Sequence, residues 1–306
     1  MRGQRHWFQM AIQLRGSVIP AILPRTVICG LFGVLISLLH HYQFPVSQPA
    51  LGSVIPSIVL GLLLVFRTNT AYERFWEGRK AWGQLVNTSR NLARQIWVAV
   101  PAHNSTEYQQ KIAALKLLVA FAVCTKLHLR QQRVNAEVEV LVSTQQFRQL
   151  QDMNNPPLEV ALWLGDYLQQ QHARNYISSQ QLTAMHELLN VLVDALGACE
   201  RILKTPMPLA YAIHLKQLLI IYCLLLPFQL VGQLGWLTGF TVALVSFTLL
   251  GIEEIGLEIE NPFGNDPNDL PIDTICATML RNIEDLIKVG DTQHVAIDNP
   301  DVTLRA

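Results

Sequence analysis

The feature that most constrains the fold of this chain is a long run without charge. From Thr26 to Phe66 the sequence has 41 residues without one Asp, Glu, Lys or Arg. As a helix rising about 1.5 Å per residue, the run would measure about 60 Å, twice the roughly 30 Å of a membrane's hydrocarbon core. Two prolines and a glycine in QFPVSQPALG break it in the middle. We therefore predict a helical hairpin with membrane spans near residues 25–42 and 50–67.

A second uncharged run, from Gln217 to Ile252, has the same design and breaks at LPFQLVGQLG. It predicts two further spans, near residues 207–228 and 235–255. Half of all residues are hydrophobic and 15% are charged, against about a quarter charged in ordinary soluble domains. The late start of the first run and the return of apolar segments argue against a cleaved signal peptide.

The loops between the spans predict the orientation. The two hairpin tips contain no Lys or Arg, whereas residues 67–205 contain fifteen. Because basic loops stay on the cytoplasmic side, both termini and the middle region are expected in the cytosol. The chain is then an inner-membrane protein in contact with the lipid bilayer, with a cytosolic region formed by residues 68–206 and 256–306.

The pattern of the middle region, residues 67–205, predicts helices. Segments such as KIAALKLLVAFAVCTKLHL and QQLTAMHELLNVLVDALGACERIL repeat apolar residues every three or four positions. The uncharged part of the first, Leu117 to Thr125, has nine residues, which is too short to cross a membrane. It predicts a buried core helix. The fold class is therefore an all-α, multi-pass membrane protein with four transmembrane helices, and residues 1–306 form one domain.

Several function classes find no support in the sequence. The five Cys residues have no CxxC spacing, so no zinc site is indicated. There is no HExxH, no Gly-x-Ser-x-Gly and no Gly-rich phosphate loop. The basic N-terminal stretch is too small to indicate nucleic-acid binding. We therefore expect no enzyme activity, and these patterns indicate no cofactor.

Three stretches resemble the bestrophin family of ion channels, in particular its bacterial members. They are FRTNTAYERFWEGRKAWGQLVNTSRN, TPMPLAYAIHLKQLLIIYCLLLPF and GIEEIGLEIENPFGNDPNDLPID. The resemblance covers about residues 1–290. It implies a homopentamer in which each subunit contributes its second membrane helix to a central pore for chloride and other anions. A Na⁺/K⁺-selective channel of the same fold, a non-conducting membrane scaffold and a carrier remain alternatives.

A stripe of apolar residues follows the second predicted span. Val54, Ile58 and Leu62 recur every four residues, and Val65 rejoins the stripe. A pentamer would stack them into apolar rings, which gate by dewetting. The resemblance places the narrow neck of the pore at these residues. Packing within the hairpin, or contact with lipid, would also produce such a stripe.

The third span begins at TPMPLAY and offers two further candidates. The resemblance implies a second constriction, the cytosolic aperture, at Met207. The alternative is an ordinary helix start, since proline suits a first turn. Lys216 lies within the same span, where a charge is a candidate functional group. Snorkelling, or pairing with Glu253 or Glu254, would equally explain it.

The stretch ENPFGNDPNDLPID matches the region that holds a calcium clasp in animal bestrophins. Asp266 and Asp269 fall on acidic ligand positions, and the backbone carbonyls of Glu258 and Asn261 would have to contribute as well. Calcium needs six to eight oxygens. This chain departs from the family's unbroken acidic string at Asn265, Pro267 and Asn268. The alternative is that Asp269 caps the helix that follows, so Ca²⁺ is a possible ligand only.

Overall fold

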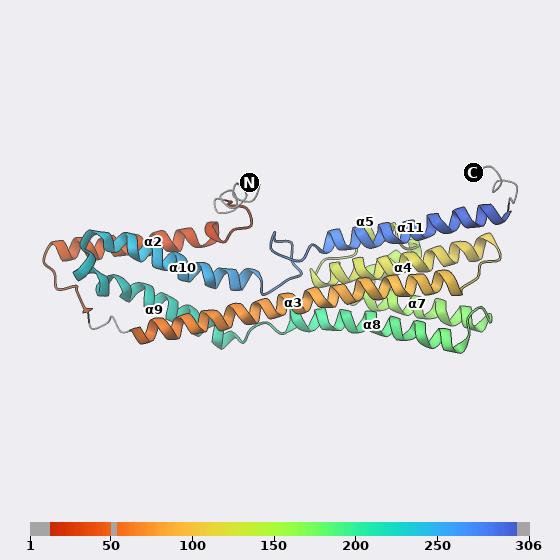
Figure 1. Cartoon of the computed structure of the whole chain (residues 1–306), viewed down its shortest axis with the longest axis horizontal. Helices are drawn as coiled ribbons and strands as arrows, with labels where there is room; N and C mark the ends of the chain where they lie inside the picture. The colour runs from red at the N-terminus through yellow and green to blue at the C-terminus, as the bar shows by residue number, and fades with distance from the viewer. Residues whose placement is uncertain (1–12, 50–53, 299–306) are drawn as a thin grey trace, which may run out of the picture. The chain divides into compact units, whose positions relative to one another are not determined.

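The computed structural model describes the backbone of residues 13–49 and 54–298 and the side chains of residues 13–49 and 55–289. Every long element in these ranges is a helix and the described residues form no strand, as the apolar periodicity predicts. Figure 1 shows the elements along the chain. In order they are α2 (Ile19–His41), α3 (Val54–Ala99), α4 (Ser105–Leu129), α5 (Ala136–Glu139), α6 (Thr144–Asp152), α7 (Pro156–Ala173), α8 (Ser179–Lys204), α9 (Leu209–Leu234), the 3-10 turn η2 (Gly235–Leu237), α10 (Thr238–Glu258) and α11 (Ile272–Asp298).

These helices belong to two compact units. The first unit takes the described residues of Met1–Trp76 and Thr205–Asp269, and the second unit those of Glu77–Lys204 and Leu270–Ala306. The first contains α2, α9, α10 and the first part of α3, and the second contains α4 to α8, α11 and the rest of α3. The described residues of the two uncharged runs thus lie in the first unit, and the charged middle region from Glu77 to Lys204 lies in the second. That residues 1–306 act as one channel domain stays a prediction.

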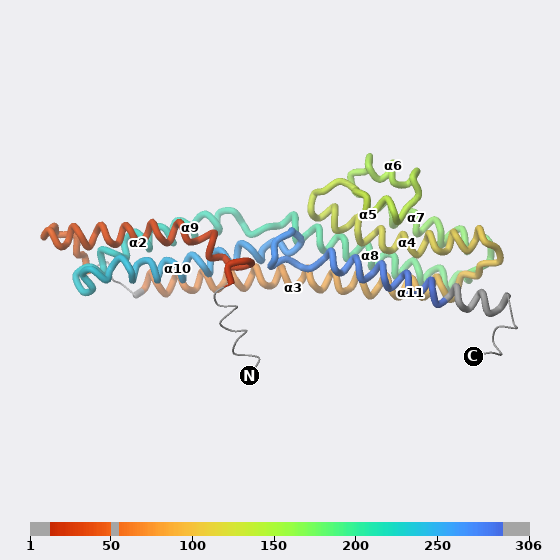
Figure 2. The backbone as a smooth tube through the Cα atoms, turned by 90° about the horizontal axis from the view of Figure 1, so that it is seen from above, coloured from red at the N-terminus to blue at the C-terminus, as the bar shows by residue number. Residues whose placement is uncertain are grey.

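Close packing through glycine joins α2 to α10 in the first unit. The two helices lie side by side in Figures 1 and 2. A Cβ atom on Gly33 would come within 2.9 Å of the Gly239 Cα, and one on Gly239 would clash with the Val34 side chain. Larger residues would therefore force the helices apart. Small residues at the contact are the usual device by which membrane helices approach closely.

The membrane helices differ from the predicted spans at two ends. α2 begins at Ile19 rather than near residue 25, because Pro20 lies in its first turn, where the missing N–H costs nothing. α9 continues through Pro227 to Leu234, whereas we predicted a break near residue 228. Proline is tolerated inside membrane helices. The chain turns instead at Gly235, whose φ of +51° suits glycine.

α3 is a continuous helix of 46 residues from Val54 to Ala99, about 69 Å at 1.5 Å per residue. The second membrane span thus continues without a break into the charged and aromatic stretch FRTNTAYERFWEGRKAWG. One face of its first part is packed. Leu60 and Leu64 are 3% and 2% exposed and form a cluster with two leucines of α9, Leu215 and Leu219.

The centre of the second unit is α4. Its residues from Leu117 to Thr125 are all buried, and α7, α8 and α11 pack against it. The prediction of a buried core helix at this position is confirmed. The hydroxyl of Thr125 donates to the carbonyl of Phe121 at 2.8 Å, so the polar group in the middle of this apolar helix is satisfied by its own backbone.

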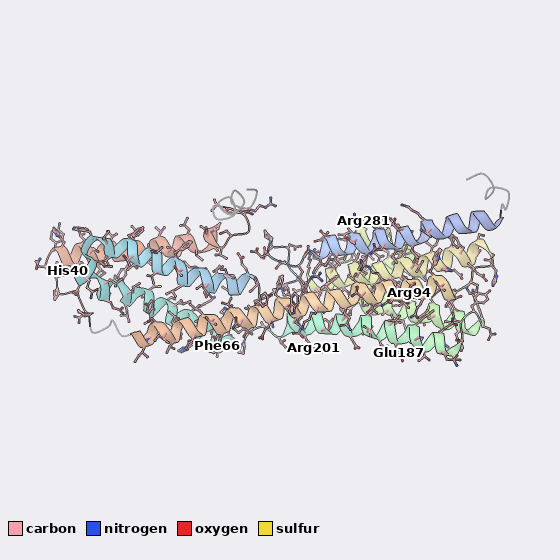
Figure 3. The ribbon with its side chains drawn as sticks, viewed as in Figure 1. His40, Phe66, Arg94, Glu187, Arg201 and Arg281 are labelled. Atoms are coloured by element: carbon pink, nitrogen blue, oxygen red, sulfur yellow. The ribbon has the colours of Figure 1, made fainter. Side chains whose placement is uncertain are left out.

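By length and composition alone, five helical segments of the described chain could cross a membrane: Ile19–His41, Ile55–Ala99, Ser105–Leu129, Ser179–Lys204 and Leu209–Glu258. The last contains α9 and α10, and its 50 residues suffice for two crossings. The apolar part of α4 is 78% buried, against 22% to 33% for the others, so protein already covers it. α8 exposes Glu187 (Figure 3) and Asp194. We therefore assign four crossings to α2, the first part of α3, α9 and α10.

Candidate pore-lining site

The predicted neck residues lie on an uncovered face of α3. Ile58 is 57% exposed and Leu62 is 53% exposed. Val54 begins the helix, but its side chain lies outside the described residues. A single chain thus leaves more than half of the Ile58 and Leu62 side chains uncovered, along about one helical turn. Lipid, another subunit or a water-filled pore must meet this apolar stripe.

Phe66 extends the stripe and was missed in the sequence. It follows Leu62 by a further step of four and is 59% exposed (Figure 3). The step of four is visible in the sequence, but Phe66 is also the last residue of the uncharged run, which marks the end of the predicted span. The exposed arc of α3 also includes Ile55, Val59 and Val65. It is therefore wider than a single row of side chains.

Arg67, the residue after Phe66, is buried and forms hydrogen bonds to two distant parts of the chain, at Met207 and at Glu260. Its side chain is 2% exposed, and its Nη2 donates to Glu260 Oε2 at 3.0 Å. Its Nη1 donates to the sulfur of Met207 at 3.0 Å. The second carboxylate oxygen of Glu260, Oε1, accepts the backbone N–H of Met207 at 2.9 Å. One buried ion pair thus fixes the chain just before α9 against α3.

Three further hydrogen bonds, two from Arg74 and one from Tyr211, join the same chain segments. Arg74 Nε donates to the backbone carbonyl of Glu260 at 3.2 Å, and its Nη1 donates to the carbonyl of Thr205. The hydroxyl of Tyr211, in the first turn of α9, donates to the carbonyl of Leu63 at 2.7 Å. The sequence indicated the two arginines only as basic residues that set the membrane orientation. Their partners lie more than a hundred residues away, and no local pattern pointed to them.

Met207, the predicted aperture residue, belongs to this hydrogen-bond network around Arg67 and Glu260. Its thioether accepts a hydrogen bond from Arg67 and its backbone N–H is bonded to Glu260. α9 begins two residues later, at Leu209, with Pro208 as the capping residue. The helix start that we considered as the alternative is therefore present. A role of Met207 as a constriction stays a prediction.

Three of the four candidate calcium ligands accept hydrogen bonds through their side chains, and Asp266 donates one through its backbone. The Asp269 carboxylate accepts the backbone N–H of Asp266 at 2.6 Å. Glu258 accepts from the Asn268 side chain at 2.6 Å, and Asn261 accepts a backbone N–H two residues further on. Among the described residues, no three or more His, Cys, Asp or Glu side chains gather in a way that could hold a metal. Calcium binding in this loop therefore stays a prediction.

The chain is similar to known membrane proteins over nearly its whole length. Residues 1–285 match the family model described as "Bacterial/Fungal Bestrophin protein". A voltage-dependent anion channel-forming protein of Nostoc sp. is 65% identical, over 96% of this chain and 99% of the relative. One of Synechocystis sp. is 56% identical, over 96% of both. The crystal structure of a bacterial bestrophin homolog from Klebsiella pneumoniae is 29% identical, with a TM-score of 0.80 over 87% of this chain and 98% of that chain.

Proposed function

Because this chain belongs to the bacterial and fungal bestrophin family, we propose that it forms an oligomeric membrane channel that conducts chloride and other small anions passively. The observation that carries the proposal is the exposed stripe of Ile58 and Leu62 beside a face, Leu60 and Leu64, that is already packed. A ring of such helices encloses a narrow apolar pore that conducts only when wetted. The preference for anions rests on the names of the relatives from Nostoc and Synechocystis.

Three rival functions make different demands on the molecule. A cation channel of the same fold would differ in the few groups that face the pore, which net charge does not reveal. A scaffold would need the same exposed face but no conduction. A carrier is expected to have helices broken near the membrane midplane. α9 continues unbroken through Pro227 and α10 runs without interruption from Thr238 to Glu258, which favours a channel.

Reversal potentials distinguish these functions. With purified protein in planar bilayers and a tenfold NaCl gradient, we expect the current to reverse near the chloride equilibrium potential, about 59 mV from zero for a perfectly selective pore. Cation selectivity moves the reversal to the opposite sign. A complete absence of current, with intact oligomers in the same preparation, would favour the scaffold.

We infer that the oligomer is a homopentamer arranged around α3. The exposed arc of this helix is wide enough for Ile58 and Leu62 to face an axis while Ile55 and Val59 contact neighbouring subunits. Native mass spectrometry in detergent should then give five copies of the 34.4 kDa chain. Monomers or dimers as the only species contradict the pore, because two helices cannot enclose one.

We also infer an inner-membrane location with both termini in the cytosol. The basic region between the two hairpins supports this orientation. Gln48 in the first hairpin tip and Gln151 in α6 are both exposed. A membrane-impermeant thiol reagent added outside intact cells should label a cysteine placed at Gln48 and leave one at Gln151 unlabelled. The parent, whose described cysteines are buried or half-buried, gives the background. The opposite labelling pattern reverses the orientation.

A further inference from the structure

A cleft between three membrane helices of the first unit combines charged groups with apolar walls. It has a volume of about 250 Å³ and is lined by Arg25, Lys216, Leu219, Ile220, Leu250 and Glu253. The lining residues come from α2, α9 and α10. Two cations and one carboxylate line it, and one of the cations, Arg25, is paired with a further carboxylate, Glu254. The three remaining lining side chains are aliphatic.

The two cations have donors left for a ligand. Arg25 is 55% exposed, and its Nη1 donates to Glu254 at 3.1 Å; a guanidinium has four other N–H groups. Lys216 is exposed and forms no ion pair within 4.0 Å among the described residues. Glu253 is 2% exposed and interacts electrostatically with Lys216. The buried carboxylate thus lies close enough to the ammonium to attract it, but the two form no ion pair.

The charged groups lie at similar depths in the membrane helices. At 1.5 Å per residue, Arg25 lies about 9 Å from the start of α2 and Lys216 about 10 Å from the start of α9, while Glu253 lies about 8 Å before the end of α10. In the proposed orientation all three helix ends are on the cytosolic side. Long basic side chains at this depth reach the lipid headgroups.

Exposed apolar residues surround the cations. On α9, Ile213 and Ile220 are 46% and 60% exposed, three residues before and four residues after Lys216. On α2, Leu23 and Ile28 are 50% and 66% exposed and flank Arg25. Lys216 and Arg25 thus stand on helix faces that suit acyl chains. A soluble anion would gain nothing from these faces, but a lipid would.

We propose that this cleft binds the phosphodiester headgroup of an anionic phospholipid, with Arg25 and Lys216 as its cationic contacts. The single negative charge of a phosphodiester would pair with Lys216, the lining cation that has no ion pair within 4.0 Å among the described residues. Charge-assisted hydrogen bonds from a guanidinium and an ammonium to phosphate oxygens are among the stronger ones in proteins. Basic pockets between helices on the cytoplasmic side suit such headgroups, and the aliphatic walls accept the start of an acyl chain.

The test measures lipid binding directly, so that its outcome does not depend on conduction. Detergent-solubilised oligomer is titrated with phosphatidylglycerol or phosphatidylcholine of equal chain length, and bound lipids are counted by native mass spectrometry. We expect phosphatidylglycerol to bind about tenfold more tightly than phosphatidylcholine. Lys216→Gln should abolish this preference, since a hydrogen bond to a charged group contributes about a tenfold factor or more. Lys216→Arg should retain it.

Lys204→Gln is the matched control. Lys204 is an exposed lysine shortly before α9 that pairs with Glu200 and does not line the cleft. If Lys204→Gln weakens phosphatidylglycerol binding as much as Lys216→Gln does, the attraction is a general surface effect and the proposal is wrong. It is also wrong if Lys216→Gln keeps the preference. Displacement of the lipid by an equal concentration of glycerol 3-phosphate would show a soluble-anion site instead.

Discussion

Alanine in place of Val54, Ile58 and Leu62 together raises chloride flux from reconstituted liposomes by about tenfold. An ion among apolar rings loses its hydration, which costs several kcal/mol unless water accompanies it. Smaller side chains widen the ring and let water stay, and about 1.4 kcal/mol off the barrier gives a tenfold faster rate. Selectivity should change less than flux. Efflux measured with a chloride-sensitive dye, at equal protein density, gives the comparison.

The matched control is alanine at Leu60 and Leu64 on the packed face of α3. These residues contact Leu215 and Leu219 of α9, so their truncation leaves cavities that cost about 2–5 kcal/mol each. The control should therefore lower thermal stability and leave the flux per folded channel near that of the parent. If the triple variant conducts like the parent while the control changes flux, the stripe faces lipid or a neighbouring helix and the pore assignment fails.

Removing both carboxylates that face Lys126, by Glu137→Gln with Asp273→Asn, lowers the free energy of unfolding by about 3 kcal/mol. Lys126 on α4 is 1% exposed, and its Nζ donates to Glu137 at 2.6 Å and to Asp273 at 2.9 Å. The amides keep the size but not the charge, so a buried ammonium loses its opposite charges; breaking a buried pair costs about 3–5 kcal/mol. Both carboxylates are more than half exposed, so we expect the lower end. Denaturant unfolding in detergent measures the loss.

Lys126→Met is the matched control for this network. It removes the buried charge and keeps much of the volume. Glu137, which is 53% exposed, can be hydrated, and Asp273 keeps its two hydrogen bonds from Arg130. We expect its free energy of unfolding to stay within about 1 kcal/mol of the parent. If Lys126→Met lowers the free energy of unfolding as much as the double variant does, the prediction is wrong. The ion pairs would then stabilise the second unit by more than the burial of the ammonium costs.

The same network gives a pH dependence with a definite sign. Hydrogen bonds from Arg130, and further ones from Lys126, lower the pKa of Asp273 from 3.8 to about 2 against the opposing effect of burial. Because the folded-state pKa lies below the unfolded one, the stability from this carboxylate is complete above about pH 4 and is lost as the pH falls toward 2. Asp273→Asn should flatten the decline in unfolding temperature over this range.

The helical architecture was largely predictable because it depends on local patterns. The lack of charge from Thr26 to Phe66 requires membrane burial, and the turn residues in QFPVSQPALG separate two spans. The apolar run from Leu117 to Thr125 is too short to span and must be covered by protein, as it is in α4. The continuity of α3 agrees with the absence of any proline after Pro56 in this helix. Each of these inferences needs only neighbouring residues.

The contacts that organise the candidate site could not be predicted from neighbouring residues in the sequence. Arg67 is separated from Glu260 by 193 positions, and no periodicity says which acid meets which arginine. The predicted span ends near residue 228, whereas α9 continues through Pro227 to Leu234, since proline is tolerated inside membrane helices. The candidate ligands Asp266 and Asp269 matched a family pattern, but the bonds between them depend on how this loop folds.

The spacing of the α3 stripe has an angular consequence. Each residue advances about 100° around a helix, so four residues make one full turn plus about 40°. Successive members of the stripe therefore point in directions that differ by about 40°. If Leu62 points at a pore axis, Ile58 and Phe66 point about 40° to either side. Turning α3 about its own axis by about 40° would bring Phe66 to the axis in place of Leu62, about 6 Å farther along. Such a turn exchanges an aliphatic constriction for an aromatic one without breaking a single backbone hydrogen bond of the helix.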